Sequence, residues 1–427
     1  IAPTAAAGMR NTPYVSAPGI AFRALELSGT TTCGVTTGKA LYCWGSGYGQ
    51  YPIRIGTGST WLNVSVGSGH TCGVTDTGGA LCWGLDDSGQ LGDGWTTNLT
   101  VPVAVSGSTT WASVAVGQRH TCGVSTGGMT WCWGSNASGQ LGDGRPITTA
   151  TYSARPVQIR FGQRWAKTEP GWGLNCGLTS DGAVRCWGAN AQGELGTGST
   201  SGSTVPLPIA RTDSWADTGT GDGFACALNS AGASYCWGAN ARGQLGDGTT
   251  VSKTTPTLVT GSQVFKSITV GRSHACGLIS SGDAYCWGAG TDGQVGNGQT
   301  TDRLTPTLVS GAIAWALLSA GDGTTCGISR ALAAYCWGAN AQGQLGDGTA
   351  LTRNAPTAVT GGLAWSSIST GSNGTCGLST QSLAYCWGSN TGGRLGDPTI
   401  ASGASVSTPN AVGGGRTQLV VHQRNQR

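Results

Sequence analysis

Sixteen cysteines fall into eight pairs, and within every pair the two residues are ten positions apart. Successive pairs begin 39, 50, 54, 50, 50, 50 and 50 residues apart, so the chain is an array of eight units with a period near 50 residues. An array of this kind buries its apolar surface between neighbouring units rather than in one central core. The pairs are Cys33 and Cys43, Cys72 and Cys82, Cys122 and Cys132, Cys176 and Cys186, Cys226 and Cys236, Cys276 and Cys286, Cys326 and Cys336, and Cys376 and Cys386.

Each cysteine pair brackets a β-hairpin signal. Between Cys276 and Cys286, two short β-prone runs flank a turn with Gly282 at its centre. The two cysteines are therefore expected opposite each other on antiparallel strands, where Cα atoms lie about 4.5 to 5.5 Å apart, within the range that a disulfide needs. We predict one disulfide in each unit. The alternatives are zinc ligation, free thiols and bonds between neighbouring units; zinc is disfavoured because the chain has only four histidines.

The remainder of each unit also reads as short strands. A proline is followed nine positions later by an aromatic residue, as in Pro102 and Trp111 or Pro256 and Phe265, and the chain then alternates with period two into the hairpin. Units are joined by Trp-Gly-x-Asn-x-x-Gly-Gln-Leu-Gly-Asp-Gly, best seen at residues 237–248. No helical periodicity appears. We predict an all-β propeller of seven or eight four-stranded blades, eight by repeat count.

The same pattern sets the expected domain organisation. We predict an N-terminal extension over residues 1–11, a single propeller over 12–412 and a C-terminal tail over 413–427 that includes a possible extra strand. The C-terminal region repeats the opening of a unit once, with Pro409 at the proline position and Gln418 at the aromatic position nine residues later, although residues 13–27 already supply that opening. Nine openings thus serve eight hairpins. The surplus copy either adds to the closing blade, dangles, or pairs with a neighbouring molecule by strand addition.

Side-chain alternation makes a packing prediction. In Trp131-Cys132-Trp133 the cysteine points to one face of the sheet and both tryptophans to the other. We expect the Trp residues of one blade to pack against the disulfide hairpin of the next blade, with Gly123 leaving room for them.

Composition excludes several classes of protein. Charged residues make up 10 % of the chain, the net charge is +4, and 17 Trp residues give it far more aromatic surface than a disordered chain carries. The basic residues are scattered singly, so we predict no nucleic-acid partner, and no apolar run is long enough to predict a membrane span. Eight disulfides require an oxidising compartment, so we predict a secreted protein that is extracellular or at the cell surface.

These motifs resemble the regulator of chromosome condensation repeat family. The resemblance rests on Gly-x-x-Tyr-x-Trp-Gly-x-Asn-x-x-Gly-Gln-Leu-Gly-x-Gly, then Pro-x-x-Val, then Val-x-x-Gly-x-x-His-Thr, and it covers residues 13 to about 412. It implies a β-propeller, commonly of seven blades. It does not fix the function, since members include a nucleotide exchange factor on chromatin, a plant ultraviolet-B photoreceptor and a secreted bacterial inhibitor of β-lactamase.

The chain departs from two of those members. Disulfides would not persist in a nucleus, and the long inserted wedge of the exchange factor is absent. The Gly-Trp-Arg-His-Thr cluster of the photoreceptor is replaced by a sequence in which Gln118 stands for the Trp. Of the three members, the secreted bacterial inhibitor is the most similar in setting, because it too is a secreted binding protein.

No residue pattern points to catalysis. His70, His120 and His274 share a repeat slot that other units fill with Thr, Leu, Phe or Gly, which indicates a local hydrogen-bonding group. An acidic residue recurs in the Gly-Asp loops, and in two units Thr or Asn takes its place. This substitution pattern favours Asx turns over acid catalysis or calcium binding. The acidic residues are Asp93, Asp143, Asp247, Asp347 and Asp397, and the replacements are Thr197 and Asn297. We predict no catalytic residue, cofactor or metal site. Candidate glycosylation sites are Asn63, Asn98, Asn136 and Asn373.

We therefore predict a non-enzymatic extracellular interaction or structural protein. It would bind a protein partner or neighbouring subunits through the propeller faces and the variable rim loops at 85–101, 145–162 and 197–207. The alternative is a secreted lectin or carbohydrate-active enzyme with a site on those loops, so a glycan is a second candidate partner.

Overall fold

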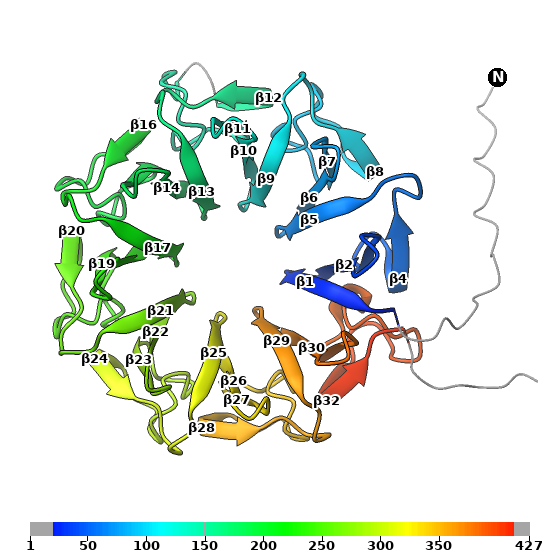
Figure 1. Cartoon of the computed structure of the whole chain (residues 1–427), viewed down its shortest axis with the longest axis vertical. Coiled ribbons are helices and arrows are strands. Elements are labelled where there is room, and N and C mark those ends of the chain that lie inside the picture. The colour runs from blue at the N-terminus through cyan, green and yellow to red at the C-terminus, as the bar shows by residue number, and fades with distance from the viewer. Residues whose placement is uncertain (1–19, 149–150, 414–427) are drawn as a thin grey trace, which may run out of the picture.

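Eight four-stranded antiparallel sheets surround a central channel in a computed structural model of the chain (Figure 1). The structure describes residues 20–148 and 151–413. The predicted propeller is thus confirmed, and the blade number is the eight given by repeat counting rather than the seven common in similar proteins.

In chain order the strands of the blades have the following bounds: β1 Phe22–Ser28, β2 Thr31–Thr36, β3 Leu41–Gly45 and β4 Gly49–Ile55; β5 Trp61–Val66, β6 His70–Thr75, β7 Ala80–Gly84 and β8 Leu99–Ala104; β9 Trp111–Val116, β10 His120–Ser125, β11 Thr130–Ser135 and β12 Tyr152–Gln158; β13 Trp165–Pro170, β14 Leu174–Thr179, β15 Val184–Gly188 and β16 Ser203–Pro208; β17 Trp215–Thr220, β18 Phe224–Asn229, β19 Ser234–Gly238 and β20 Lys253–Leu258; β21 Phe265–Val270, β22 His274–Ile279, β23 Ala284–Gly288 and β24 Arg303–Leu308; β25 Trp315–Ala320, β26 Thr324–Ser329, β27 Ala334–Gly338 and β28 Arg353–Ala358; β29 Trp365–Thr370, β30 Gly374–Ser379, β31 Ala384–Ser389 and β32 Ser405–Ala411. One 3₁₀ turn, η1, spans Thr391–Gly393.

Every blade is built from one continuous stretch of chain that runs outward from the channel (Figure 1). The proline-containing strand is the outermost strand of a blade, and the aromatic residue nine positions later opens the innermost strand of the next. The surplus copy around Pro409 therefore completes the last blade in cis, where Ala411 of β32 pairs with Tyr385 of β31. The predicted extension (1–11), Pro13 at the start of the first opening, Gln418 at the end of the surplus opening and all of the tail except Gly413 lie outside the described residues.

All eight predicted disulfides are present, one in each blade. Each joins residues that face each other across the central hairpin, such as Cys276 on β22 and Cys286 on β23, with Cα atoms 4.1 Å apart. All sixteen cysteines are used, so neither zinc ligation, free thiols nor bonds between blades are realised. The other seven bonds join Cys33 to Cys43, Cys72 to Cys82, Cys122 to Cys132, Cys176 to Cys186, Cys226 to Cys236, Cys326 to Cys336, and Cys376 to Cys386. Every bond crosslinks the two middle strands of its blade.

Aromatic side chains fill the junctions between blades. Trp133 is fully buried and packs against the Cys72–Cys82 disulfide, together with Trp111 of its own blade. The predicted contact between Trp and disulfide is confirmed, but its direction was wrong, because the disulfide belongs to the preceding blade. Alternation assigns Trp and Cys to opposite faces without telling which neighbour each face meets. The expected role of Gly123 was also wrong: a Cβ there would lie 2.6 Å from the ring of Trp111, the first aromatic of the same blade.

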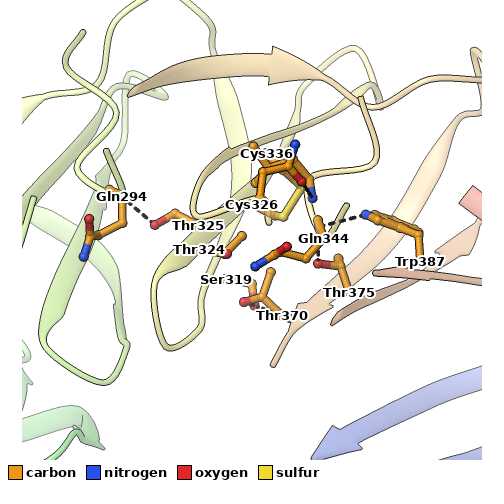
Figure 2. The surroundings of a disulfide bond; sticks show 12 residues. Gln294, Ser319, Thr324, Thr325, Cys326, Cys336, Gln344, Thr370, Thr375 and Trp387 are labelled. Atoms are coloured by element: carbon orange, nitrogen blue, oxygen red, sulfur yellow. Dashed lines mark hydrogen bonds between the residues drawn. A yellow bond between two sulfur atoms is a disulfide. The ribbon is translucent and has the colours of Figure 1, made fainter. Parts of the chain in front are cut away.

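The Gly-Gln-Leu-Gly loops tie each blade to the one that follows. Trp337 Nε1 donates a hydrogen bond to the backbone carbonyl of Gln294 in the preceding blade (2.9 Å), and Thr325 donates to the same carbonyl (2.9 Å). Figure 2 shows Thr325 on Gln294 and, at the next junction, Trp387 on Gln344. The Trp bond recurs at seven junctions, including the closure of the ring, where Trp44 donates to Arg394. At the remaining junction Trp83 donates instead to the hydroxyl of Tyr48.

Candidate functional site

The histidines that share a repeat slot are structural. His120 Nε2 donates to Asn175 Oδ1 of the next blade (2.9 Å), whose amide donates to the Gln140 carbonyl. His70 and His274 make the equivalent bond to a threonine at 2.8 Å. Burial lowers the pKa of His70 to about 3, further lowered by charge on His120, and burial lowers the pKa values of His120 and His274 to about 4. All three rings are buried, and each bridges two blades through its Nε2 atom.

The acidic loop residues form the predicted Asx turns. Asp347 Oδ1 accepts the backbone N–H of Thr349 at 2.9 Å. The same bond from the residue two positions on is made at Asp93, Asp143, Asp247, Asn297 and Asp397. Across residues 20–148 and 151–413, no group of three or more His, Cys, Asp or Glu side chains could hold a metal ion.

The four candidate glycosylation sites differ in exposure. Asn98 and Asn373 are exposed, and Asn63 is half-buried. Asn136 is fully buried and accepts the backbone N–H of Leu141 at 3.0 Å, so the folded chain leaves no room for a glycan there. Glycosylation of the other three stays a prediction.

A concave site with a volume of about 460 Å³ lies at one mouth of the central channel. It is formed where the ends of the innermost strands meet the loops that follow them, and each blade contributes one copy of the same repeat positions. Leu27, Val66, Val116, Pro170 and Val270 make much of its wall apolar. A polar and charged rim stands above that wall.

The rim carries an aromatic residue and three charges. Trp172 is 59 % exposed, and the guanidinium of Arg272 lies 5.5 Å from the centre of its ring. Arg272 also forms an ion pair with Asp222 at 3.2 Å. Asp322 has no ion-pair partner within 4 Å in the described part of the chain, and desolvation raises the pKa of its carboxyl, which Arg272 partly offsets.

Further charged side chains lie on the innermost strands that lead to this cavity. Lys167 on β13 bonds to Asp217 of the next blade and lies 3.2 Å from Glu169. Glu26 enters from β1, and burial followed by the charge of Glu169 raises its pKa to about 7. Among the groups named at the mouth and on these strands, five carboxyl groups stand beside two cations, and the pKa of Glu26 leaves that side chain partly protonated near pH 7. An apolar wall beside this excess of carboxyl groups suits an apolar group that carries a positive charge.

Two of the predicted rim loops carry exposed apolar side chains on the face that holds this mouth. Trp95 in the 85–101 loop is 71 % exposed and Ile147 in the 145–162 loop is 41 % exposed. In the 197–207 loop, the structure shows a hydrogen bond between Thr197 and Ser199.

The residues of the channel mouth were missed in the sequence. Trp172, Asp222, Arg272 and Asp322 occupy one repeat slot, two positions before the histidine slot, and a Gly precedes each of them. The sequence does contain a signal for this slot, namely a variable position next to a nearly constant one. The preceding Gly recurs in seven of the eight copies, whereas the slot itself holds Gly, Ser, Gln, Trp, Asp or Arg. Only the closed ring shows that these positions converge.

The chain matches models of a known repeat. The model described as the regulator of chromosome condensation (RCC1) repeat matches residues 77–124, 231–278, 281–328 and 333–378. A second model of that repeat matches residues 61–90, 111–140 and 265–294, and together the matches cover more than half of the chain. No curated protein sequence is significantly similar to it.

Similar solved structures share the fold at low sequence identity. Human WBSCR16 is 20 % identical with a TM-score of 0.65, covering 78 % of this chain and 90 % of its own. Prp20p from Saccharomyces cerevisiae is 18 % identical with a TM-score of 0.62, covering 79 % and 90 %. Yeast RCC1 (Prp20) bound by Kap60 is 18 % identical with a TM-score of 0.63, covering 87 % and 94 %.

None of the helical turns in the described ranges has the length and hydropathy of a bilayer-spanning helix. The eight disulfides are compatible with an extracellular protein. From its repeat matches and its propeller fold, the chain belongs to the regulator of chromosome condensation (RCC1) repeat family.

Proposed function

We propose that the chain is an extracellular, non-enzymatic propeller that binds a protein partner through the face holding the channel mouth. Among the similar structures, yeast Prp20p is described with its binding to Gsp1p and histones, and yeast RCC1 (Prp20) is bound by Kap60. Those partners belong to the yeast proteins. What is carried over is the general role of a protein-binding propeller.

The observation that carries the proposal is the exposed Trp172 beside an apolar cavity. Trp and Arg are among the residue types that dominate binding energy in protein interfaces, and here Trp172 and Arg272 lie together at the rim. Asp322, whose carboxyl has no ion-pair partner in the described ranges, supplies an acceptor for a positive group on the partner. Trp95, on a rim loop of the same face, provides a second exposed apolar side chain.

We propose that the chain is not an enzyme, because its described residues include groups suited to binding but no arrangement of groups suited to catalysis. The buried histidines bond across blades, and the acidic residues at the mouth lie beside Arg272 rather than beside a nucleophile. The extracellular location is supported by the disulfides, because reducing compartments would open them.

In the test, the native chain and its variants are used to capture proteins from an extract of the native source. The affinity of each chain for every recovered protein is then measured. We expect one protein to bind the native chain, Trp172→Ala to weaken that binding at least about tenfold, as for an interfacial anchor, and Asp322→Asn to weaken it less. Leu258→Ala, which truncates an exposed residue on the outer strand β20, should leave the affinity unchanged. A carbohydrate array is probed in parallel. Glycan binding or turnover without a protein partner would favour the lectin or enzyme and reject the proposal.

A further inference from the structure

Blade 1 lacks an element that the other seven blades possess. Its third and fourth strands, β3 and β4, are joined by a short turn at residues 46–48, without a Gly-Gln-Leu-Gly loop. In the other blades the aliphatic residue of that loop is fully buried between blades; these residues are Leu91, Leu141, Leu195, Leu245, Val295, Leu345 and Leu395. The junction between blades 1 and 2 is therefore incomplete.

At the other junctions the loop makes two kinds of contact with the next blade. Its central carbonyl accepts the Trp N–H, as described above. A glycine at its end also donates its backbone N–H to a carbonyl on the outer strand of the next blade, as Gly348 does to Ser407 at 2.8 Å. Six junctions share this second bond; the donors are Gly94, Gly144, Gly198, Gly248, Gly298 and Gly348.

Only the innermost part of the missing loop is replaced. The Tyr48 hydroxyl accepts the N–H of Trp83, and Tyr48 packs into the core of the junction. Outside it lies a cleft of about 340 Å³ bounded by both blades. Gly84, which lines the cleft, is half-buried, whereas the glycines at the same position in the other seven blades are buried.

The cleft exposes the groups that a loop would cover. Leu85 is 48 % exposed and lines the cleft with Leu99, at a position where the other blades carry Ser or Ala. Thr100 stands two positions before Pro102, as Ser407 stands before Pro409, so its carbonyl corresponds to the acceptor used at six junctions. Thr100 is exposed, and blade 1 has no loop that reaches it.

We propose that this cleft binds a loop of a partner protein, a glycine-flanked turn with one aliphatic side chain, in the position of the missing loop. A backbone N–H of that turn donates to the Thr100 carbonyl, and the aliphatic side chain packs against Leu85 and Leu99. Seven loops within the chain place an aliphatic side chain at such a junction, and six of them also make the backbone hydrogen bond. The inference deepens the proposed function, on which it rests, by adding a second contact on the same face and naming what that contact recognises.

The test uses purified components. The probe is a peptide with the sequence of residues 340–348, Asn-Ala-Gln-Gly-Gln-Leu-Gly-Asp-Gly, and its control has Asp in place of Leu. Binding to the full chain with labelled leucine methyl groups is followed by NMR. We expect the first peptide to shift the Leu85 and Leu99 methyl signals and the control peptide not to. Leu85→Glu should lower the affinity at least about tenfold, and Leu351→Glu, at a more exposed leucine outside the cleft, should not.

A second variant replaces residues 46–48 with the loop of blade 7, which should fill the cleft and abolish peptide binding. The proposal is overturned if the peptide leaves the Leu85 and Leu99 signals unchanged, or if the Leu and Asp peptides bind equally. Sedimentation that shows a dimer of the native chain and a monomer of Leu85→Glu would assign the cleft to a second copy and also overturn it. None of these outcomes depends on Trp172, so failure here is distinguishable from failure of the proposed function.

Discussion

At the scale of single residues, burial decides which polar groups are structural. His70, His120 and His274 look like candidates for chemistry in the sequence, yet each lies between blades with one ring nitrogen bonded across the junction. Their replacement by other residue types in other blades predicted this role correctly. By contrast, Trp172 and Arg272 could not be singled out, because their importance comes from convergence around the channel rather than from local sequence.

The buried histidines predict a specific pH dependence. The pKa of His120 is about 4 in the folded chain and near 6.5 when unfolded, so the unfolded state binds the extra proton first and stability falls as pH drops below about 6.5. We expect a loss of roughly 2 kcal/mol between pH 7 and pH 5 from this residue. Calorimetric melting of His120→Gln, which keeps a side-chain N–H donor, should show a weaker fall over that range. Equal slopes for both proteins would refute the prediction.

At the scale of the blade, alternation and spacing specify most of the element. The hairpin, its disulfide and the burial of the Trp residues follow from period-two patterning around the cysteines. The neighbour that each face meets does not follow, because it depends on how blades are arranged around the ring. The repeat position of Gly123, which lies against an aromatic ring, does not require glycine in every blade. In blade 5, Ala227 occupies this position beside Trp215.

The loop-to-blade hydrogen bond predicts a measurable cost. Trp337→Phe removes the donor to the Gln294 carbonyl inside a buried junction, so we expect a loss of about 1 to 3 kcal/mol in the free energy of unfolding. Trp95→Phe, at a side chain that is 71 % exposed, is the matched control and should change stability by less than about 0.5 kcal/mol. Denaturant melts of the two variants compare them directly. Similar losses in both would argue that the bond contributes nothing.

At the scale of the whole molecule, blades 8 and 1 meet at the closure of the ring, and among the described residues each keeps four strands from its own stretch of chain. The closure relies on the contacts used elsewhere: Trp44 and Thr32 donate to the Arg394 carbonyl, and the buried Arg394 guanidinium donates to Gly29. Repeat counting predicted eight blades, and the first interval of 39 residues is the shortest in the array. The cleft beside Tyr48 could not be predicted, because an omitted loop becomes a site only when its neighbours are in place.

The stapled blades and the extracellular location both depend on eight intact disulfides in the protein as it is made in its native source. The direct measurement is the intact mass after treatment with an alkylating reagent in denaturant without reductant, and again after reduction. We predict no alkyl groups in the first sample and sixteen in the second, one for each cysteine. Sixteen groups already present before reduction would contradict both the stapled blades and the extracellular location.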